Sequence, residues 1–240
     1  MAGHSHWAGI KHKKGRQDSA RAKVFSKLSR EITVAAKLGA KNPESNPRLR
    51  TAIQTAKQSN MPKDNIERAI NKSEMNLNET YQNLRYEGFG PNNVALIIET
   101  LTENKNRTAS NIRTILQKNG GRLGESGSTS YLFSNCGVIH INKNKISSET
   151  IMDTAINAGA KDFNSNLEYY EIVTEKEDFY KVKNEIEKKI SDFLYSGIEW
   201  RPHSYIDATK DQKEKILPLI ESLNQDDDVQ KIFFNCKLKI

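Results

Sequence analysis

The residues of this chain best placed to bind a ligand are cations near its N-terminal end. Four of them fall close together and no acidic residue precedes them: Lys11, Lys13, Lys14 and Arg16. Trp7 lies a few positions earlier. Cations contact phosphates and an indole stacks on a base, so this combination is typical of a segment that follows a nucleic-acid strand. Packing of Trp7 against the folded body of the protein is an equal alternative.

The positive charge of the chain is confined to one segment. The first 72 residues carry 16 Lys and Arg against 5 Asp and Glu, whereas the remaining 168 carry 21 against 25. The net charge of +7 therefore arises entirely from the first segment. Such charge separation indicates a polyanionic partner, most commonly nucleic acid. A basic surface that serves only solubility is the alternative.

Residues 19–38 are predicted to form the helix that positions the next cations. At about 100° per residue its apolar side chains gather on one face: Val24, Phe25, Leu28, Ile32, Ala35 and Ala36. The opposite side carries Lys23, Lys27, Arg30 and Lys37. We call Lys23, Lys27 and Arg30 the cationic stripe and predict that it neutralises nucleic-acid phosphates. Gly39 is expected to end the helix in a left-handed conformation.

Two further helices complete a predicted three-helix bundle. Asn46 and Pro47 have the residue types that cap and begin a helix. Arg48 and Arg50 follow as further candidates for contact with nucleic acid. A break at 59–62 precedes a short third helix, and the two helices around it could form a helix-turn-helix. That turn contains no glycine, so insertion of the short helix into a major groove is the weaker alternative.

The remainder of the chain alternates strand-like and helix-like segments. Strands are predicted at 94–101, 130–133, 137–142, near Asp162, 168–174, 198–205 and 229–238, and helices at 108–119, 148–158, 178–191 and 210–223. From residue 137 the order is βαββαβ, which is the ferredoxin-like pattern. The sequence therefore predicts an α+β multidomain protein with its basic helices first.

No motif of the chain predicts catalysis, a metal site or a cofactor. The glycine-rich stretch at 120–128 lacks the phosphate-binding pattern and is better explained as a helix end followed by a hinge. The three aspartates at 226–228 lack the spacing of a calcium loop and are expected to form a solvated turn. His203 has no catalytic partner in any local signature.

Two further observations concern the compartment. Cys136 and Cys236 are far apart in strand-like runs, so they are expected to be buried thiols in a reducing environment. The chain contains no apolar run of the roughly 18 residues that a membrane span needs. The expected location is the cytoplasm.

The order of several segments resembles a known family. The chain contains, in this order, MAGHSHW, IKHKKGRQDSARAKVFSKLSREI, AAKLG, NPRLR, NMPKDNIERAI, YEGFGP, ENKNRT, NGGRLGESGSTSYLF and GVI. Together they are similar to the YebC/PmpR family, which includes transcriptional regulatory proteins and a mitochondrial translational activator. The resemblance implies that the ferredoxin-like domain is inserted into a split middle α/β domain. The implied domains are the basic helical domain at 1–75, the middle domain at 76–134 plus 206–240, and the inserted domain at 135–205.

Charge and resemblance together predict a nonenzymatic regulator that binds nucleic acid, with DNA as its target. Base readout is expected from Trp7, Arg48, Arg50 or the third helix, and the α/β domains are available for a protein partner or an effector. A translation factor that binds ribosomal RNA is one alternative, because both polymers offer phosphates. An enzyme working between the two α/β domains is the other, and it requires a titratable pair within hydrogen-bond reach.

Overall fold

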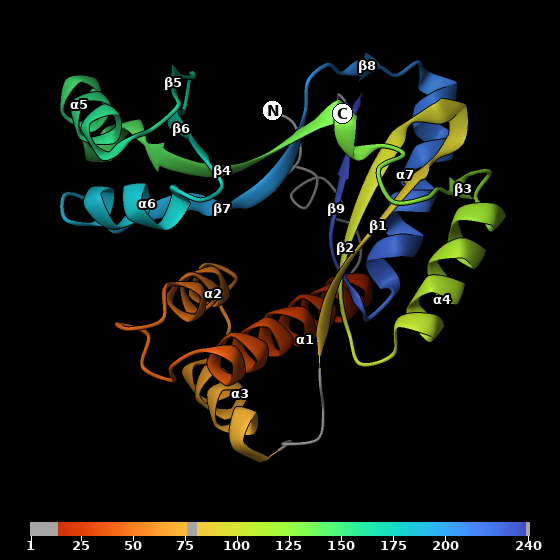
Figure 1. Ribbon diagram of the computed structural model, residues 1–240, viewed down its shortest axis with the longest axis horizontal. Coiled ribbons are helices and arrows are strands. Elements are labelled where there is room, and N and C mark those ends of the chain that lie inside the picture. Colours follow the sequence, from red (N-terminus) through yellow and green to blue (C-terminus); the bar gives the residue numbers. More distant parts are fainter. Residues whose placement is uncertain (1–13, 76–80, 239–240) are drawn as a thin grey trace. The chain divides into compact units, whose positions relative to one another are not determined.

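The structure is a computed structural model, and it describes residues 14–75 and 81–238 (Figure 1). The chain divides into two compact units, one of residues 135–201 and one of everything else. Helices come first and antiparallel sheets follow, so the predicted mixed α+β class is confirmed. The division into three domains stays a prediction. No helix within the described ranges is long and apolar enough to cross a bilayer.

The first three helices form a bundle around a shared apolar core. They are α1 (Lys14–Leu38), α2 (Pro47–Gln58) and α3 (Lys63–Met75). The helix α1 begins five residues before the predicted start. The core contains apolar residues of all three helices, including Ile32, Leu49 and Ile66, each at most 5% exposed. From the predicted apolar face of the first helix it includes Phe25, Leu28, Ile32, Ala35 and Ala36 but not Val24. The hydroxyl of Thr33 donates a hydrogen bond to the carbonyl of Ala69 at 2.8 Å, which joins α1 to α3.

Asn46 fixes the connection between α1 and α2. Its side-chain oxygen accepts a hydrogen bond from the Leu49 amide at 3.0 Å, as the predicted cap requires. Its side-chain amide donates to the carbonyls of Ala35 and Ala40 at 2.8 and 2.7 Å. A Cβ at Gly39 would lie 2.6 Å from this amide. The reason for glycine here is therefore close approach; the expected left-handed conformation is wrong, because Gly39 has no positive φ.

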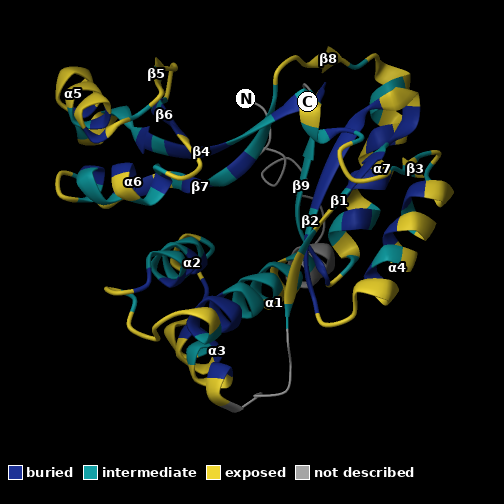
Figure 2. Cartoon of the chain, in the orientation of Figure 1, coloured by how far each residue is buried: buried dark blue, intermediate teal, exposed yellow. Residues whose placement is uncertain are grey.

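A four-stranded antiparallel sheet forms the centre of the larger unit, in the order β3-β1-β2-β9. The strands are β1 (Gln82–Phe89), β2 (Ala95–Thr102), β3 (Arg122–Leu123) and β9 (Val229–Phe234). Helices α4 (Lys105–Lys118) and α7 (Lys210–Gln225) pack on one face of this sheet (Figure 1). The central strand β2 is almost entirely buried, as its continuous apolar run predicts (Figure 2).

Two segments of this unit differ from the predicted strands. Of the predicted strand 130–133, the first three residues form a 3₁₀ turn, η3 (Ser130–Leu132), and Phe133 is the first residue of the strand that follows. A second 3₁₀ turn, η2 (Pro91–Asn93), precedes β2. The predicted strand 229–238 is interrupted at Asn235, whose side-chain oxygen accepts from the Ala95 amide at 2.9 Å. After this break β10 (Cys236–Lys237) pairs in parallel with β8 (Ile206–Asp207).

The smaller unit has the βαββαβ element order. Its sheet has the order β5-β6-β4-β7, and its core lies between this sheet and two helices. The elements are β4 (Phe133–Asn142), η4 (Lys143–Lys145), α5 (Ser148–Ala158), β5 (Asp162–Ser165), β6 (Tyr169–Glu175), α6 (Phe179–Glu187) and β7 (Phe193–Pro202). Cys136 in this unit and Cys236 in the larger one are buried and free, as expected.

Candidate nucleic-acid interface

The cationic stripe of α1 contacts the end of α7 and the residues that follow it. We call residues 224–228, which comprise the last two residues of α7 and three aspartates, the acidic turn. The ammonium group of Lys23 donates to the Gln225 carbonyl at 3.0 Å and forms an ion pair with the Asp227 carboxylate. Lys27 donates to the Asn224 carbonyl at 3.0 Å. The stripe thus faces an acidic part of the same chain, a placement that its sequence pattern does not predict.

The contacts have a simple electrostatic cause. The last carbonyl groups of a helix have no partner within the helix and carry a partial negative charge. In α7 this end is followed directly by Asp226, Asp227 and Asp228, which add full negative charges. Lys23 and Lys27 therefore donate hydrogen bonds to carbonyl groups at this helix end, and Lys23 also neutralises the Asp227 carboxylate.

Burial changes the protonation of the middle residue of the stripe. Loss of hydration, followed by the neighbouring charge of Lys23, lowers the pKa of Lys27 from 10.5 to about 8. Asp226 and Asp227 oppose this shift with a smaller effect. Lys27 therefore loses its charge at a lower pH than an ordinary lysine does.

Arg30 and Asp228 form the most buried part of this contact. The Arg30 guanidinium lies 3.1 Å from the Asp228 carboxylate and donates to the Asp227 carbonyl at 2.7 Å. Asp228 is only 5% exposed. It also accepts hydrogen bonds from Thr102, Thr108 and Arg107, at 3.1, 2.7 and 3.0 Å. The expectation of a solvated turn is therefore wrong for Asp228, because four side chains take the place of water around its carboxylate.

The ionisation of Asp228 follows from these partners. Burial on its own raises the pKa of a carboxyl group. Here the hydrogen bonds from Thr108 and Arg107, together with the charge of Arg107, outweigh burial and lower the pKa of Asp228 below its ordinary value. The group is a permanent anion at neutral pH.

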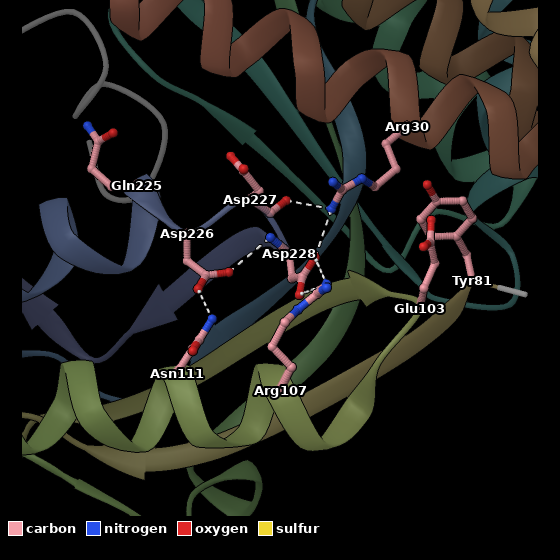
Figure 3. Close-up of a pocket in the computed structure, with 9 residues that line it drawn as sticks. All are labelled: Arg30, Tyr81, Glu103, Arg107, Asn111, Gln225, Asp226, Asp227 and Asp228. Atoms are coloured by element: carbon pink, nitrogen blue, oxygen red, sulfur yellow. Dashed lines mark hydrogen bonds and ion pairs between the residues drawn. The ribbon is translucent and has the colours of Figure 1, made fainter. Parts of the chain in front are cut away.

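A cavity of about 490 Å³ lies beside this ion-pair network (Figure 3). Its lining is polar and mostly charged: Arg30, Tyr81, Glu103, Arg107, Asn111, Gln225, Asp226, Asp227 and Asp228. The guanidinium groups of Arg30 and Arg107 are both directed at the Asp228 carboxylate, as the dashed lines of Figure 3 show. In the described parts of the chain no group of three or more His, Cys, Asp and Glu residues could hold a metal ion.

Arg48 and Arg50, the other cations proposed from the sequence, have partners within or close to the bundle. Arg48 forms two hydrogen bonds with the Glu31 carboxylate, at 2.7 and 3.0 Å. Arg50 donates to the carbonyls of Pro43 and Glu44, both at 3.2 Å. Both side chains are half-buried. They fix helix positions in this structure, and their contact with nucleic acid stays a prediction.

The N-terminal candidates are described only in part. Trp7, Lys11 and Lys13 lie outside the described residues. Lys14 and Arg16 belong to the first turn of α1. These two residues therefore belong to the same helix as the cationic stripe, and the contact of the arm with nucleic acid stays a prediction.

Exposed cations gather at a place that the sequence does not single out, the turn between α2 and α3. Arg21 donates to the Asn60 carbonyl in this turn at 3.4 Å, and its guanidinium lies 5.2 Å from the centre of the Phe25 ring. Lys57 is exposed three residues before Asn60, and Lys63 is exposed three residues after it. The sequence gives one sign of this group of cations, because Arg21 falls on the side of the predicted helix that is otherwise apolar. In the structure Arg21 is exposed.

The glycine-rich loop at 120–128 is held by a buried carboxylate that the sequence does not reveal. Glu87 of β1 is 2% exposed and accepts hydrogen bonds from the amides of Thr129 and Ser130, both at 2.8 Å. Burial raises the pKa of a carboxyl group, but the amide hydrogen bonds outweigh burial and lower the pKa of Glu87. Gly120, two residues after the end of α4, adopts a left-handed conformation with φ of 74°. These features support the predicted helix end rather than a nucleotide site.

The smaller unit contains a titratable pair within hydrogen-bond reach. His140 on β4 lies 3.0 Å from the Glu171 carboxylate on β6, and Arg201 on β7 binds the same carboxylate through two nitrogens. Burial is outweighed by the hydrogen bonds from His140 and Arg201, so the pKa of Glu171 falls to about 2. A carboxylate with so low a pKa is a poor general base at neutral pH. The contacts of Glu171 with His140 and Arg201 are therefore best explained as structural.

Comparison with known proteins identifies relatives along the whole chain. The family model described as "TACO1/YebC protein N-terminal domain" matches residues 5–76, and the one described as "TACO1/YebC second and third domain" matches residues 81–236. A probable transcriptional regulatory protein of Pelagibacter ubique (strain HTCC1062) is 54% identical over 239 residues. This match covers 100% of the chain and 99% of the relative.

A solved structure has the same fold. The crystal structure of a conserved hypothetical protein from Aquifex aeolicus matches with a TM-score of 0.80 and 43% sequence identity. The match covers 98% of each chain. The arrangement of helices followed by antiparallel sheets is therefore shared with an experimentally determined relative.

Proposed function

The chain belongs to the TACO1/YebC family, and on this premise we propose that it is a nonenzymatic regulatory protein that binds nucleic acid, with DNA as the target. The name of the Pelagibacter relative supports the regulatory role. The observation that carries the proposal is the charge separation, because 16 of the 37 basic residues lie in the first 72 positions with only 5 acidic ones. We place its action in the cytoplasm, with the three domains implied by the resemblance.

The binding surface proposed has two parts. The first is the N-terminal arm with Trp7, Lys11, Lys13, Lys14 and Arg16. The second is the cationic group around the α2–α3 turn, where Arg21, Lys57 and Lys63 are exposed. Arg48 and Arg50 are candidates for base contacts only if binding releases their present partners.

A ribosome-associated translation factor that binds ribosomal RNA is the second candidate. The resemblance of the chain to a family with a mitochondrial translational activator favours it. Phosphate contacts alone do not distinguish the two polymers, since they carry no sequence information. The distinction has to come from the nucleic acid that the protein meets in cells.

Crosslinking in cells tests which polymer is bound. The full chain is crosslinked and purified, and the recovered nucleic acid is sequenced. Enrichment of chromosomal DNA supports the proposal, whereas enrichment of ribosomal RNA with co-sedimentation on ribosomes supports the translation factor. Recovery of neither polymer above an unrelated basic protein contradicts nucleic-acid binding.

Charge reversal tests the surface. The arm variant carries four changes: Lys11→Glu, Lys13→Glu, Lys14→Glu and Arg16→Glu. The control variant carries the same change of net charge on exposed lysines elsewhere: Lys176→Glu, Lys181→Glu, Lys189→Glu and Lys215→Glu. We expect the arm variant to lose at least about tenfold in affinity for duplex DNA and the control to lose much less, because local phosphate contacts dominate affinity. Equal losses would show that only net charge matters.

A further inference from the structure

The acidic turn offers the cationic stripe the same chemistry that a nucleic-acid backbone offers. Lys23, Lys27 and Arg30 occupy one face of α1, because positions separated by four and three residues are neighbours on a helix. Opposite them lie the carbonyl oxygens of Asn224 and Gln225 and the carboxylate of Asp227. The two carbonyl oxygens carry a partial negative charge and the carboxylate a full one, and phosphate oxygens offer lysines the same kind of acceptor. The turn is therefore a chemical substitute for a short stretch of backbone.

The contact is strong at one end and weak at the other. At the Arg30 end, Asp228 has 7% of its side chain exposed and is held by four side chains. At the Lys23 end, 31% of the Lys23 side chain and 61% of the Asp227 side chain are exposed. Exposed ion pairs contribute little to stability and are screened by salt. The Lys23 end can therefore separate without disturbing the buried network around Asp228.

We infer that the acidic turn competes with nucleic acid for Lys23 and Lys27, so that these two cations contact phosphates only after the turn releases them. This inference rests on the proposed function, since it names a regulation of the same binding activity. A competitor on the same chain acts at a high effective concentration, so even a weak contact lowers the affinity of an external polyanion. Arg30 remains paired with Asp228 in both states and keeps the stripe near the turn.

The first experiment removes the competing charge. Asp227→Asn deletes the carboxylate that pairs with Lys23, and it leaves the Asp227 carbonyl that accepts from Arg30. Asp211→Asn is the matched control, because this exposed aspartate lies in the first turn of α7, at the end of the helix remote from the acidic turn, and gives the same change of net charge. Both variants are compared with the parent for binding to a DNA duplex of about 20 base pairs.

We expect the gain in affinity for the duplex to depend on which aspartate is changed and on the salt concentration. At about 50 mM salt, Asp227→Asn binds about fivefold more tightly than Asp211→Asn, and at about 200 mM salt the difference shrinks, because the competing ion pair is already screened. An equal affinity of the two variants at low salt overturns the inference. Thermal unfolding of both variants establishes that neither change alters the fold.

The second experiment observes the contact directly. A carbodiimide joins a carboxylate to a neighbouring amine without a spacer, so it links Asp227 to Lys23 in the free protein. We expect mass spectrometry to find this link in the free parent, and to find much less of it when saturating duplex is present. An unchanged yield with saturating duplex contradicts release of Lys23.

The two experiments separate the inference from the proposed function. If the parent and both variants fail to bind duplex DNA and ribosomal RNA fragments alike, the proposed function fails, and the inference fails with it. If all three bind equally and the link persists, nucleic-acid binding stands and only the competition is wrong.

Discussion

The guanidinium of Arg30 lies 3.1 Å from the carboxylate of Asp228, although 198 positions separate the two residues in the sequence. Arg30 comes from the first helix and Asp228 from the residue directly before β9. The same carboxylate accepts from Thr102 and Thr108, which flank the start of α4. One buried anion therefore joins α1, α4 and the start of β9.

Replacing Asp228 is expected to destabilise the larger unit strongly. Asp228→Asn keeps the shape but removes the charge that holds Arg30 and Arg107, so we expect a loss of about 3 kcal/mol in the free energy of unfolding. Urea denaturation at neutral pH measures it. Asp227→Asn in the same turn is the control and should cost less than about 1 kcal/mol, because its side chain is exposed. Similar losses in both variants would contradict the role of Asp228.

Glu171 predicts how the stability of the smaller unit depends on acid. Its folded pKa is about 2 and its ordinary value is 4.5, so the stabilisation is complete above pH 4.5 and is lost as the pH falls towards 2. The shift corresponds to about 3 kcal/mol. Glu171→Gln should be less stable at neutral pH and should lack this acid-dependent part.

Tryptophan fluorescence can follow this unit alone. The chain has two tryptophans, and Trp200 lies in β7. In a Trp7→Phe background, urea denaturation between pH 5 and pH 2 therefore reports on residues 135–201. Parallel pH profiles for the parent and Glu171→Gln would contradict the assigned pKa shift.

Lys27 predicts a dependence of the same sign at alkaline pH, where stability again rises as the pH increases. Its pKa is about 8 when folded and 10.5 ordinarily, so between these values the unfolded chain binds more protons. Stability from this group therefore rises as the pH increases from about 8 to about 10.5. Lys27→Met should remove this rise.

The measurement is the difference between parent and Lys27→Met in the free energy of unfolding across that pH range. A difference is needed because Cys136, with a pKa raised by burial to about 11, also contributes at alkaline pH. If the difference between the two proteins stays constant from pH 7 to pH 10, Lys27 is not desolvated as the structure indicates.

Glu87 is expected to control the order of the glycine-rich loop. Glu87→Gln removes the charge that strengthens the bonds from the Thr129 and Ser130 amides. We expect amide hydrogen exchange in residues 124–130 to accelerate by about tenfold, which corresponds to the loss of one charged hydrogen bond. Glu125→Gln, an exposed change in the same loop, is the control and should leave exchange unaltered. No acceleration in either variant would argue against the anchoring role.

Local sequence signals were sufficient for much of the fold. The cap at Asn46, the apolar run of β2 and the alternation of strands and helices after residue 137 act between neighbouring residues, so their outcome can be read from spacing. The partners of the charged residues could not be read in this way. The three aspartates at 226–228 have the composition of a solvated turn, and only the folded chain brings Arg30 and Arg107 to Asp228.

The partners of the residues in the candidate site could likewise not be predicted from local sequence patterns. A helical pattern correctly places Lys23, Lys27 and Arg30 on one face of α1 but does not say what covers that face. Glu87 gave no signal, since a single glutamate in a strand is ordinarily exposed. Arg21 does not fit the predicted apolar face, and the structure shows it exposed within α1.

The salt dependence of DNA binding by the full chain tests the central claim most directly. Contacts between the basic N-terminal segment and five or six phosphates predict that the logarithm of the binding constant falls with the logarithm of salt concentration with a slope of about −5. The arm variant with Lys11, Lys13, Lys14 and Arg16 changed to glutamate should bind weakly and with a much shallower slope. A parent slope near zero, or an arm variant that binds within about twofold of the parent with the same slope, would contradict the account.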